Sequence, residues 1–504
     1  MAKKCMAALA IMMLVTWSAL AQDAKTVIAN ASKAMGYDEL RTIEYSGSGL
    51  EGTALGQAQS ATGGWPKFTL KNFSRYIDLN AGSGQQTALR SRPLDPATGQ
   101  LPGGGGLAAT PETQQVTPIN ANGTWAQKLD VSLSPPGFLK LASAAANATV
   151  TSRNVNGRKY TVVSFPLQAK APSGVAYSIS GYINSDNMVE KVETTIEEPN
   201  LIGDMLVEQS YSGYKDFGGV KFPTQIVQKR AGLSWTSLAV TDVKANTPAP
   251  PPPPPPAGRG GAPGGAGGGG GGRGAAPAIA SKKLGEGVYM TTGGYRSVAV
   301  EFKDYIVLIE APNNEMTTAN IIEEVKKAIP NKPIKYVVNT HTHFDHSGGL
   351  RAAAAEGAII ITHESNKPLY EKWFSNSRTL LMPDKLAQSG RKPKVEYVGE
   401  KKVLKEGAQA VELYHLKGAL HAEDTIVAYL PALKTVIEAD AFNAPAPNAA
   451  APQSVNGFEK LLASELDRLK IDYTTIIPVH QPAGGDRAVT KADLFKNIGR
   501  ASSN

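Results

Sequence analysis

The stretch Thr340-His341-Thr342-His343-Phe344-Asp345-His346-Ser347-Gly348-Gly349 holds four side chains of metal-binding type within six residues. The first of these side chains, His341, directly follows residues 335–340, a β-branched and aromatic run that predicts a buried strand. Ligands gather at the carboxyl ends of strands in open α/β sheets, so the cluster lies where a site is normally built. We also expect the two glycines to let the backbone turn into a helix at 352–355.

Two metal ions fit this pattern better than one. All seven histidines lie between His341 and His480. Three further candidates each follow a predicted strand, at 410–414, 435–439 and 474–479; they are His421, Asp440 and His480. We expect one ion to be held by His341, His343 and His421 and the other by Asp345, His346 and His480, with Asp440 between them.

A less specific explanation competes at several of these positions. A histidine or aspartate that follows a strand commonly caps a turn. His421, Asp440 and His480 are therefore candidate ligands only because the cluster at 341–346 is also present. The two other histidines suit structural roles: His363 is expected to start a helix and His415 to pack within a strand.

The series His-Thr-His-Phe-Asp-His, His421, Asp440 after eighteen intervening residues, and His480 resembles the ligands of the metallo-β-lactamase superfamily. The resemblance covers about residues 278–504. It implies an αββα sandwich, in which two sheets pack face to face with helices outside, and usually hydrolysis by zinc. This chain departs from the common family pattern beside two ligands, with Leu420 and Ala422 around His421 and with Val479 and Gln481 around His480.

The donor set suits zinc, which we expect at two ions per chain, although iron and manganese accept the same ligands. His343 occupies a position where oxygen-reducing di-iron relatives have a carboxylate, which disfavours that activity; a single-iron sulfur dioxygenase remains an alternative. Two ions roughly 3.5–4 Å apart lower the pKa of a shared water, so a metal-bound hydroxide is the expected nucleophile. Asp345 is the predicted catalytic residue, which would orient that hydroxide and pass its proton to the leaving group.

The start of the chain predicts export. Lys3 and Lys4 precede an apolar run at 7–15, and the small residues at 18–21 resemble a signal-peptide cleavage site. Residues 1–21 are therefore a predicted signal peptide, and the mature protein is expected in the periplasm or outside the cell. Removal of the signal peptide, which contains the single cysteine, Cys5, would leave a mature protein without cysteine and therefore without disulfides. No later apolar run is long enough for a transmembrane segment.

Composition predicts two domains and a linker. Residues 250–256 are all proline, and a glycine-rich segment follows. This composition predicts that 246–277 is a linker that tethers two domains. The net charge of +8 falls to +6 without Lys3 and Lys4 and is spread along the chain, so no nucleic-acid partner is expected. The oligomeric state stays open.

The N-terminal domain, 22–245, is expected to be a β-rich antiparallel curved sheet after a helix at 24–35. Alternating runs recur from 159 to 243, separated by turn residues. Its segments at 181–183 and 221–224 resemble those of periplasmic lipoprotein carriers. The domain is expected to bind a substrate or ligand, or to serve as a scaffold. The segment at 443–452 lacks a periodic pattern and either covers the substrate pocket or simply connects two elements.

These inferences predict an α+β protein with a metallo-β-lactamase-like hydrolase domain at 278–504. Its substrate would be a small-molecule ester, thioester, lactone or amide. A β-lactam hydrolase of antibiotic resistance is one alternative. The other is a carrier of an apolar ligand, which would use the N-terminal sheet while the metal domain is vestigial.

Overall fold

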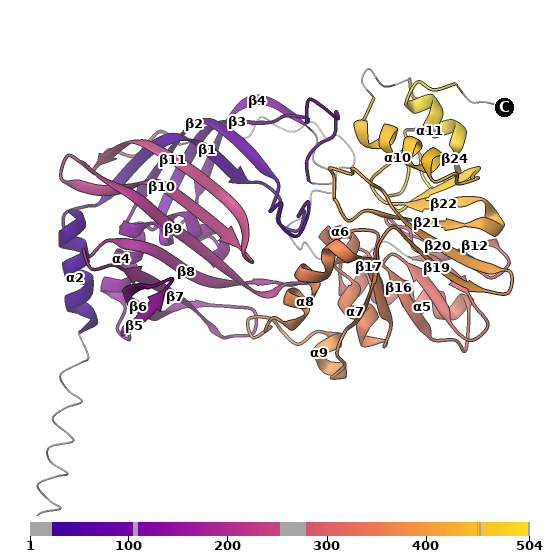
Figure 1. Cartoon of the computed structure of the whole chain (residues 1–504). Helices are drawn as coiled ribbons and strands as arrows, with labels where there is room; N and C mark the ends of the chain where they lie inside the picture. Colours follow the sequence, from indigo (N-terminus) through magenta and orange to yellow (C-terminus); the bar gives the residue numbers. More distant parts are fainter. Residues whose placement is uncertain (1–22, 104–108, 253–278, 451, 453–454, 502–504) are drawn as a thin grey trace, which may run out of the picture.

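The computed structural model describes residues 23–103, 109–252, 279–450, 452 and 455–501, and Figure 1 shows the chain as a cartoon. The predicted signal peptide and most of the predicted linker lie outside these residues. The described part is of mixed α and β structure, with an antiparallel N-terminal sheet and two further sheets. The boundaries of the two domains stay a prediction.

The N-terminal half is built on one eleven-stranded antiparallel sheet of order β4-β3-β2-β1-β11-β10-β9-β8-β7-β6-β5. Its strands are β1 Thr42–Gly52, β2 Lys67–Asp78, β3 Ser83–Arg92, β4 Thr110–Ile119, β5 Thr149–Val155, β6 Arg158–Lys170, β7 Ala176–Ile183, β8 Val189–Glu198, β9 Gly203–Phe217, β10 Val220–Arg230 and β11 Leu233–Ala245. Its helices are α2 Ala24–Met35, η1 Trp125–Lys128, α3 Leu129–Ser132 and α4 Pro135–Ala144. The predicted helix at 24–35 and the alternating runs from β6 to β11 are confirmed.

Helix α4 packs against one face of this sheet. The ring of Phe138 on α4 is fully buried, and a Cβ atom added at Gly181 on β7 would lie 2.2 Å from it. Phe138 also lies beside the ring of Phe165 on β6, with centroids 5.9 Å apart. Side chains of the protein itself therefore fill the space between α4 and the sheet.

The C-terminal half contains two sheets. The first has the order β12-β13-β14-β15-β16-β17-β18 and the second the order β19-β20-β21-β22-β23-β24. The strands of the first are β12 Ala280–Gly285, β13 Val288–Thr292, β14 Val298–Glu301, β15 Ile306–Ile309, β16 Ile334–Val338, β17 Ile359–His363 and β18 Lys394–Val398. Those of the second are β19 Lys401–Glu406, β20 Gln409–His415, β21 Ile426–Leu430, β22 Thr435–Glu438, β23 Thr475–Pro478 and β24 Val489–Thr490.

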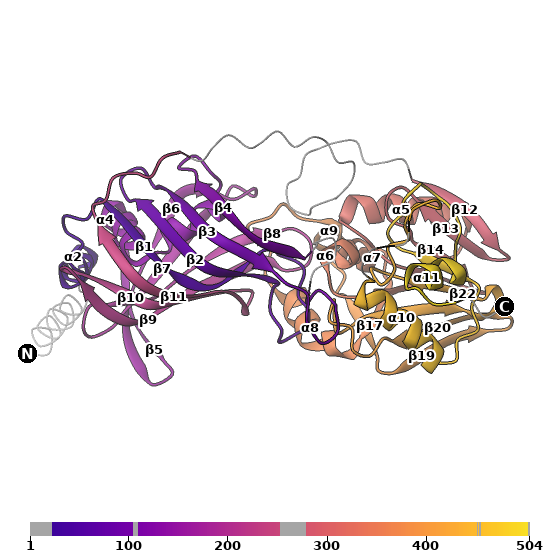
Figure 2. The same ribbon diagram turned by 90° about the horizontal axis from the view of Figure 1, so that it is seen from above.

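Helices accompany both sheets, as Figure 2 shows from above. They are α5 Glu315–Ala328, α6 Phe344–Ser347, α7 Leu350–Ala355, η2 Glu364–Asn366, α8 Lys367–Ser375, α9 Lys385–Ser389, η3 Pro431–Leu433, α10 Gly457–Arg468 and α11 Lys491–Asn497. None of the helices in the described part of the chain is long and apolar enough to cross a membrane.

Alternation along the strands explains how these layers form. On β15, Val307 and Ile309 belong to the apolar cluster that both C-terminal sheets share, whereas Ile306 and Leu308 belong to the cluster beneath α5 and α7. On the second sheet, Val427 of β21 faces the cluster that contains α10 and α11. The strands thus have apolar side chains on both faces, and helices cover the outer ones.

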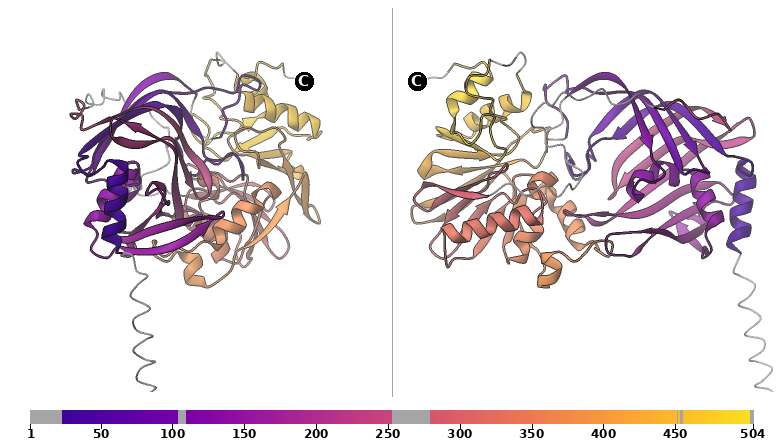
Figure 3. Two further views of the ribbon diagram at one scale, coloured as in Figure 1. Left: turned by 60° about the vertical axis from the view of Figure 1, so that its left-hand side comes forward. Right: turned by 180° about the vertical axis from the view of Figure 1, so that it is seen from behind.

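The two halves are packed together, which corrects the expectation of independent tethered domains. One continuous apolar cluster contains buried residues of both halves. At its centre the rings of Trp65 and Trp373 lie nearly parallel, with centroids 6.2 Å apart, and Phe344 meets both edge-on. The Asp204 carboxylate also accepts hydrogen bonds from the backbone amides of Thr379 and Leu380. A linker composition shows that a segment cannot fold, but it carries no information on whether the flanking domains bind each other. The right-hand view of Figure 3 shows the two halves side by side from behind.

Candidate metal centre

The cluster begins at the carboxyl end of β16, as predicted; α6 carries Asp345 and His346, and α7 follows the cluster. The helix α6 was not predicted. Gly348 and Gly349 form the expected turn into α7, although both have negative φ angles that any residue can adopt. Glycine is needed for close packing instead: an added Cβ would lie 2.0 Å from the carbonyl oxygen of Asn313 at Gly348 and 1.8 Å from Thr318 Oγ1 at Gly349.

The structure brings all seven predicted ligands together. Two groups have side-chain donor atoms within 4.8 Å of one another, and Asp440 belongs to both. The first group is His341, His343, His421 and Asp440, and the second is Asp345, His346, Asp440 and His480. The distribution over the two groups is the one expected from the sequence.

Asp440 lies at the centre of the site. Its Oδ2 atom is 2.8 Å from His421 Nε2 and 3.2 Å from His346 Nε2, and its Oδ1 atom is 2.6 Å from His480 Nε2. The residue has a φ of +64°, which L side chains rarely adopt. Strain of this kind is found where surrounding structure holds a functional group in place.

The pKa values of the buried histidines favour the binding of a cation at this site. Burial, with a smaller contribution from His346, lowers the pKa of His341 to about 3, and burial likewise lowers the pKa of His343 well below its usual range. Both are therefore neutral imidazoles at pH 7, the form that binds metals. Burial opposes a positive charge on His346, but Asp345 and Asp440 raise its pKa well above its usual value. Positive charge is thus favoured between the two carboxylates.

Unpartnered nitrogens provide a test of whether a metal fits. Both ring nitrogens of His343 are buried without a hydrogen-bond partner among the described residues, whereas the Nε2 atom of His341 lies 3.3 Å from Asp440 Oδ2. Buried polar atoms that lack a partner are costly and rare, and a metal ion would satisfy these. The donor set of five imidazoles and two carboxylates also matches zinc chemistry. The residues present therefore fit a metal.

The comparisons with known proteins agree with this arrangement. The sequence model described as the metallo-beta-lactamase superfamily matches residues 292–480. Residues 292–480 thus belong to the metallo-beta-lactamase superfamily. The predicted resemblance is confirmed for the C-terminal half, and the matched segment includes all seven predicted ligands. No curated protein matches the chain.

Solved structures similar to this chain include two metallo-beta-lactamases. That of Pontibacter korlensis is 19% identical, covers 44% of this chain and 97% of its own, and has a TM-score of 0.34. That of Hirschia baltica is 20% identical, covers 45% of this chain and 99% of its own, and has a TM-score of 0.32.

The buried residues that surround the seven candidate ligands were not predicted from the sequence. Asn339 donates from Nδ2 to the carbonyl oxygens of His341, at 2.6 Å, and His346, at 3.3 Å, so it holds both ends of the ligand loop. Glu310 is fully buried, and its Oε2 atom lies 3.4 Å from His346 Nδ1. Glu438 accepts hydrogen bonds from the amides of Ala441 and Phe442 and thereby fixes the turn that carries Asp440.

A sequence signal existed for some of these residues. Glu310 directly follows the apolar strand β15 and Glu438 ends β22, where a buried acidic residue is unusual unless it is paired. The structural roles expected for the other two histidines are confirmed: His363 caps η2 by accepting from Ser365, and its ring stacks on that of His415 in β20.

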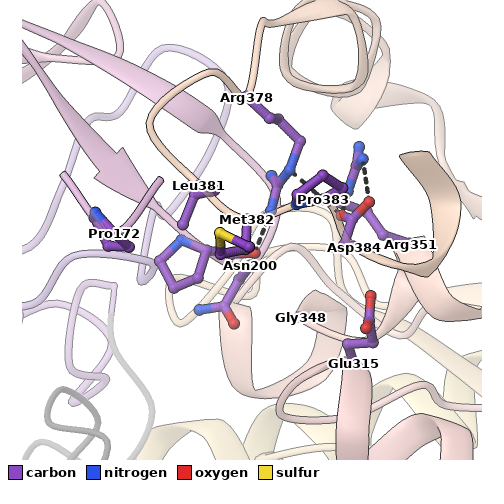
Figure 4. A pocket seen from close by; sticks show the side chains of 11 residues that line it. Pro172, Asn200, Glu315, Gly348, Arg351, Arg378, Leu381, Met382, Pro383 and Asp384 are labelled. Atoms are coloured by element: carbon purple, nitrogen blue, oxygen red, sulfur yellow. Dashed lines mark hydrogen bonds and ion pairs between the residues drawn. The ribbon is translucent and has the colours of Figure 1, made fainter. Parts of the chain in front are cut away.

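A separate pocket of about 350 Å³ lies between the two halves (Figure 4). Its lining includes Pro199 and Asn200 from the N-terminal half and Arg351, Arg378 and Asp384 from the superfamily domain. None of the seven predicted ligands lines it. Both arginines pair with Asp384, and Glu315 also lines the pocket, so its two positive and two negative charges balance.

Proposed function

We propose that this protein is an exported metal-dependent hydrolase with two zinc ions per chain, which cleaves a small-molecule ester, thioester, lactone or amide. The observation that carries the proposal is the pair of ligand groups joined at Asp440, in which both ring nitrogens of His343 are buried without a partner. Two clusters with a shared carboxylate are the arrangement that two-metal hydrolysis requires. The predicted signal peptide is the basis for export.

We further propose that the C-terminal layers form the αββα sandwich that the resemblance implies. The apolar cluster shared by both sheets and the two outer clusters that include helices support this order of layers.

When bound, two zinc ions activate a water molecule and polarise the bond that is cleaved. Asp345 is the protein group placed to orient that water. Its Oδ2 atom lies 3.4 Å from His346 Nε2 and 3.6 Å from His480 Nε2, so it faces the second ligand group. Burial opposes its ionisation, but His346 holds its pKa well below the usual range. It is therefore a carboxylate at neutral pH and can accept a proton and pass it to the leaving group.

Among the described residues, the ligands differ in how exposed they are. The side chains of His480 and Asp345 are 30% and 24% exposed, whereas those of His341 and His346 are fully buried. A substrate would therefore arrive over the Asp345 and His480 side. The segment at 443–450 is irregular and joins β22 to the approach to α10, and Ala444 accepts a hydrogen bond from Ala483. Whether it covers the substrate remains a proposal.

A substrate panel tests the function. The zinc-loaded full chain is assayed with lactones, thioesters, carboxylic esters and β-lactams. Beside it stands His343→Ala, which removes a proposed ligand whose ring nitrogens have no hydrogen-bond partner among the described residues. We expect turnover of one of these classes and its loss, by at least about 100-fold, in the variant. Preference for β-lactams would establish the antibiotic-resistance alternative. Lack of turnover together with a co-purifying lipid would favour the carrier function.

A further inference from the structure

The exposed side of the metal centre is bordered by the N-terminal half. The segment 53–66 joins β1 to β2 and reaches the ligand loop, and the cartoon in Figure 1 shows this part of the chain beside α6. Gln57 in this segment donates a hydrogen bond from Nε2 to Asp345 Oδ1 over 3.2 Å. The two residues are 288 positions apart in the sequence. A side chain of the N-terminal half thus touches the predicted catalytic carboxylate.

Asp345 is held from both sides. Gln57 binds Oδ1, while the Tyr295 hydroxyl, on the connection between β13 and β14, donates to Oδ2 over 3.2 Å. The Tyr295 ring also packs on that of His480, with centroids 4.7 Å apart. Two donors from different halves therefore fix the rotation of a carboxylate that would bind a metal and orient water.

The contact belongs to a built interface. The amide of Phe344, next to Asp345, donates to the carbonyl oxygen of Gly56 over 2.9 Å. Gly56 has a φ of +89°, and a Cβ atom there would lie 2.4 Å from the Phe344 ring, so only glycine allows this approach. The amide of Glu423, near His421, donates to the Gln59 carbonyl over 2.8 Å. Gln57 is therefore held at a fixed distance from the ligands.

A second N-terminal segment touches the loop that carries His421. Gln100 accepts from the amide of Leu420 over 2.9 Å and donates to the carbonyl of Gly418 over 3.1 Å. The amide of Gly103 donates to the carbonyl of Leu420 over 3.0 Å. Both groups of ligands therefore border on the N-terminal half.

We propose that the active site is assembled from both halves of the chain, with Gln57 as a positioning residue that orients Asp345. This inference rests on the proposed hydrolytic function. It gives the N-terminal half a part in the chemistry, in place of simple tethering. Gln57 acts through Asp345, because its amide donor holds the carboxylate oxygen that does not face His346 and His480. Partners of this kind set the orientation and the affinity of metal ligands.

The test uses the full chain with Gln57→Ala, which removes the amide, and Gln57→Glu, which keeps its size but cannot donate from this position. Gln59→Ala is the matched control, since that residue contacts the superfamily domain through its backbone. Zinc affinity is measured by competition with a chelator, and the visible spectrum of the cobalt-loaded protein reports the geometry of the ligands. Thermal unfolding shows whether each variant folds, and kcat and KM are measured separately.

We expect both Gln57 variants to bind one of the two ions about 10-fold more weakly, to change the cobalt spectrum and to lose kcat with little change in KM. Gln59→Ala should match the wild type. Wild-type affinity, spectrum and kcat in both Gln57 variants would overturn the inference while the hydrolase function stands. A wild-type chain that binds neither zinc nor cobalt would overturn both.

Discussion

Replacement of Glu310 by glutamine tests how the buried residues behind the ligands support the site. Glu310 is fully buried, has a φ of +82°, and lies with Oε2 2.6 Å from Thr340 Oγ1 and 3.4 Å from His346 Nδ1. An anion there fixes the His346 ring so that Nδ1 carries the proton and Nε2 faces the site. Glutamine keeps the shape and can still accept from Thr340, but it removes the negative charge.

The size of the effect follows from these contacts. Loss of a partner behind a metal ligand typically weakens metal binding by about 10–100-fold, or about 1.4–2.7 kcal/mol. The contact to His346 is long for a hydrogen bond, and the bond to Thr340 can be retained. We therefore expect about a 10-fold loss of affinity for the ion on the His346 side, with the other ion little changed.

Chelator competition with zinc measures this effect in Glu310→Gln, and Glu323→Gln, an exposed residue of α5, is the control. Thermal unfolding of both metal-free variants shows whether the fold is retained. Affinities within about twofold of the wild type for both ions would refute the view that Glu310 supports His346.

Two further predictions concern stability. Trp373 is 1% exposed and its ring is stacked on Trp65 of the other half, so Trp373→Ala should lower the free energy of unfolding in urea by about 3–5 kcal/mol. The control Met316→Ala, at a residue that is 57% exposed, should have little effect. A loss below about 1 kcal/mol for Trp373→Ala would contradict a core shared by the two halves. Burial raises the pKa of Glu459 from 4.5 to about 7, so the folded state favours the protonated carboxyl. The stability that the protonated Glu459 side chain contributes is therefore present below pH 4.5 and is lost as the pH rises through 7. Glu459→Gln should therefore be more stable than the wild type at pH 8, by about 1–2 kcal/mol after screening, and the two should converge at pH 4; a constant difference in urea unfolding at both values would contradict this.

The sequence sufficed for elements with a strong local pattern. The alternation from β6 to β11 and the apolar runs of β16 and β22 predicted strands because each run reflects the burial of its own side chains. The seven candidate ligands were found for a related reason: each is a residue of metal-binding type at or soon after a strand end. Strands from β1 to β5 were missed, since their exposed positions and interrupting glycines and prolines weaken the alternation.

Contacts between distant residues left no local signal. Trp65 is buried by Trp373, and Gln57 meets Asp345 across both halves, but a tryptophan or a glutamine in an irregular segment has many other uses. The proline-rich run suggested independence because it cannot form a core, yet the surfaces on either side decide whether the halves pack. The support that Asn339 gives to the ligand loop was likewise hidden, since its side chain bonds to backbone atoms.

The metal content of the protein from Gln22 onward, by elemental mass spectrometry beside His343→Ala, tests the central claim most directly. We expect about two zinc ions per chain in the wild type and a clear fall in the variant, because the ring nitrogens of His343 have no hydrogen-bond partner among the described residues. Absence of stoichiometric metal in the wild type, or equal metal in both proteins, would contradict it.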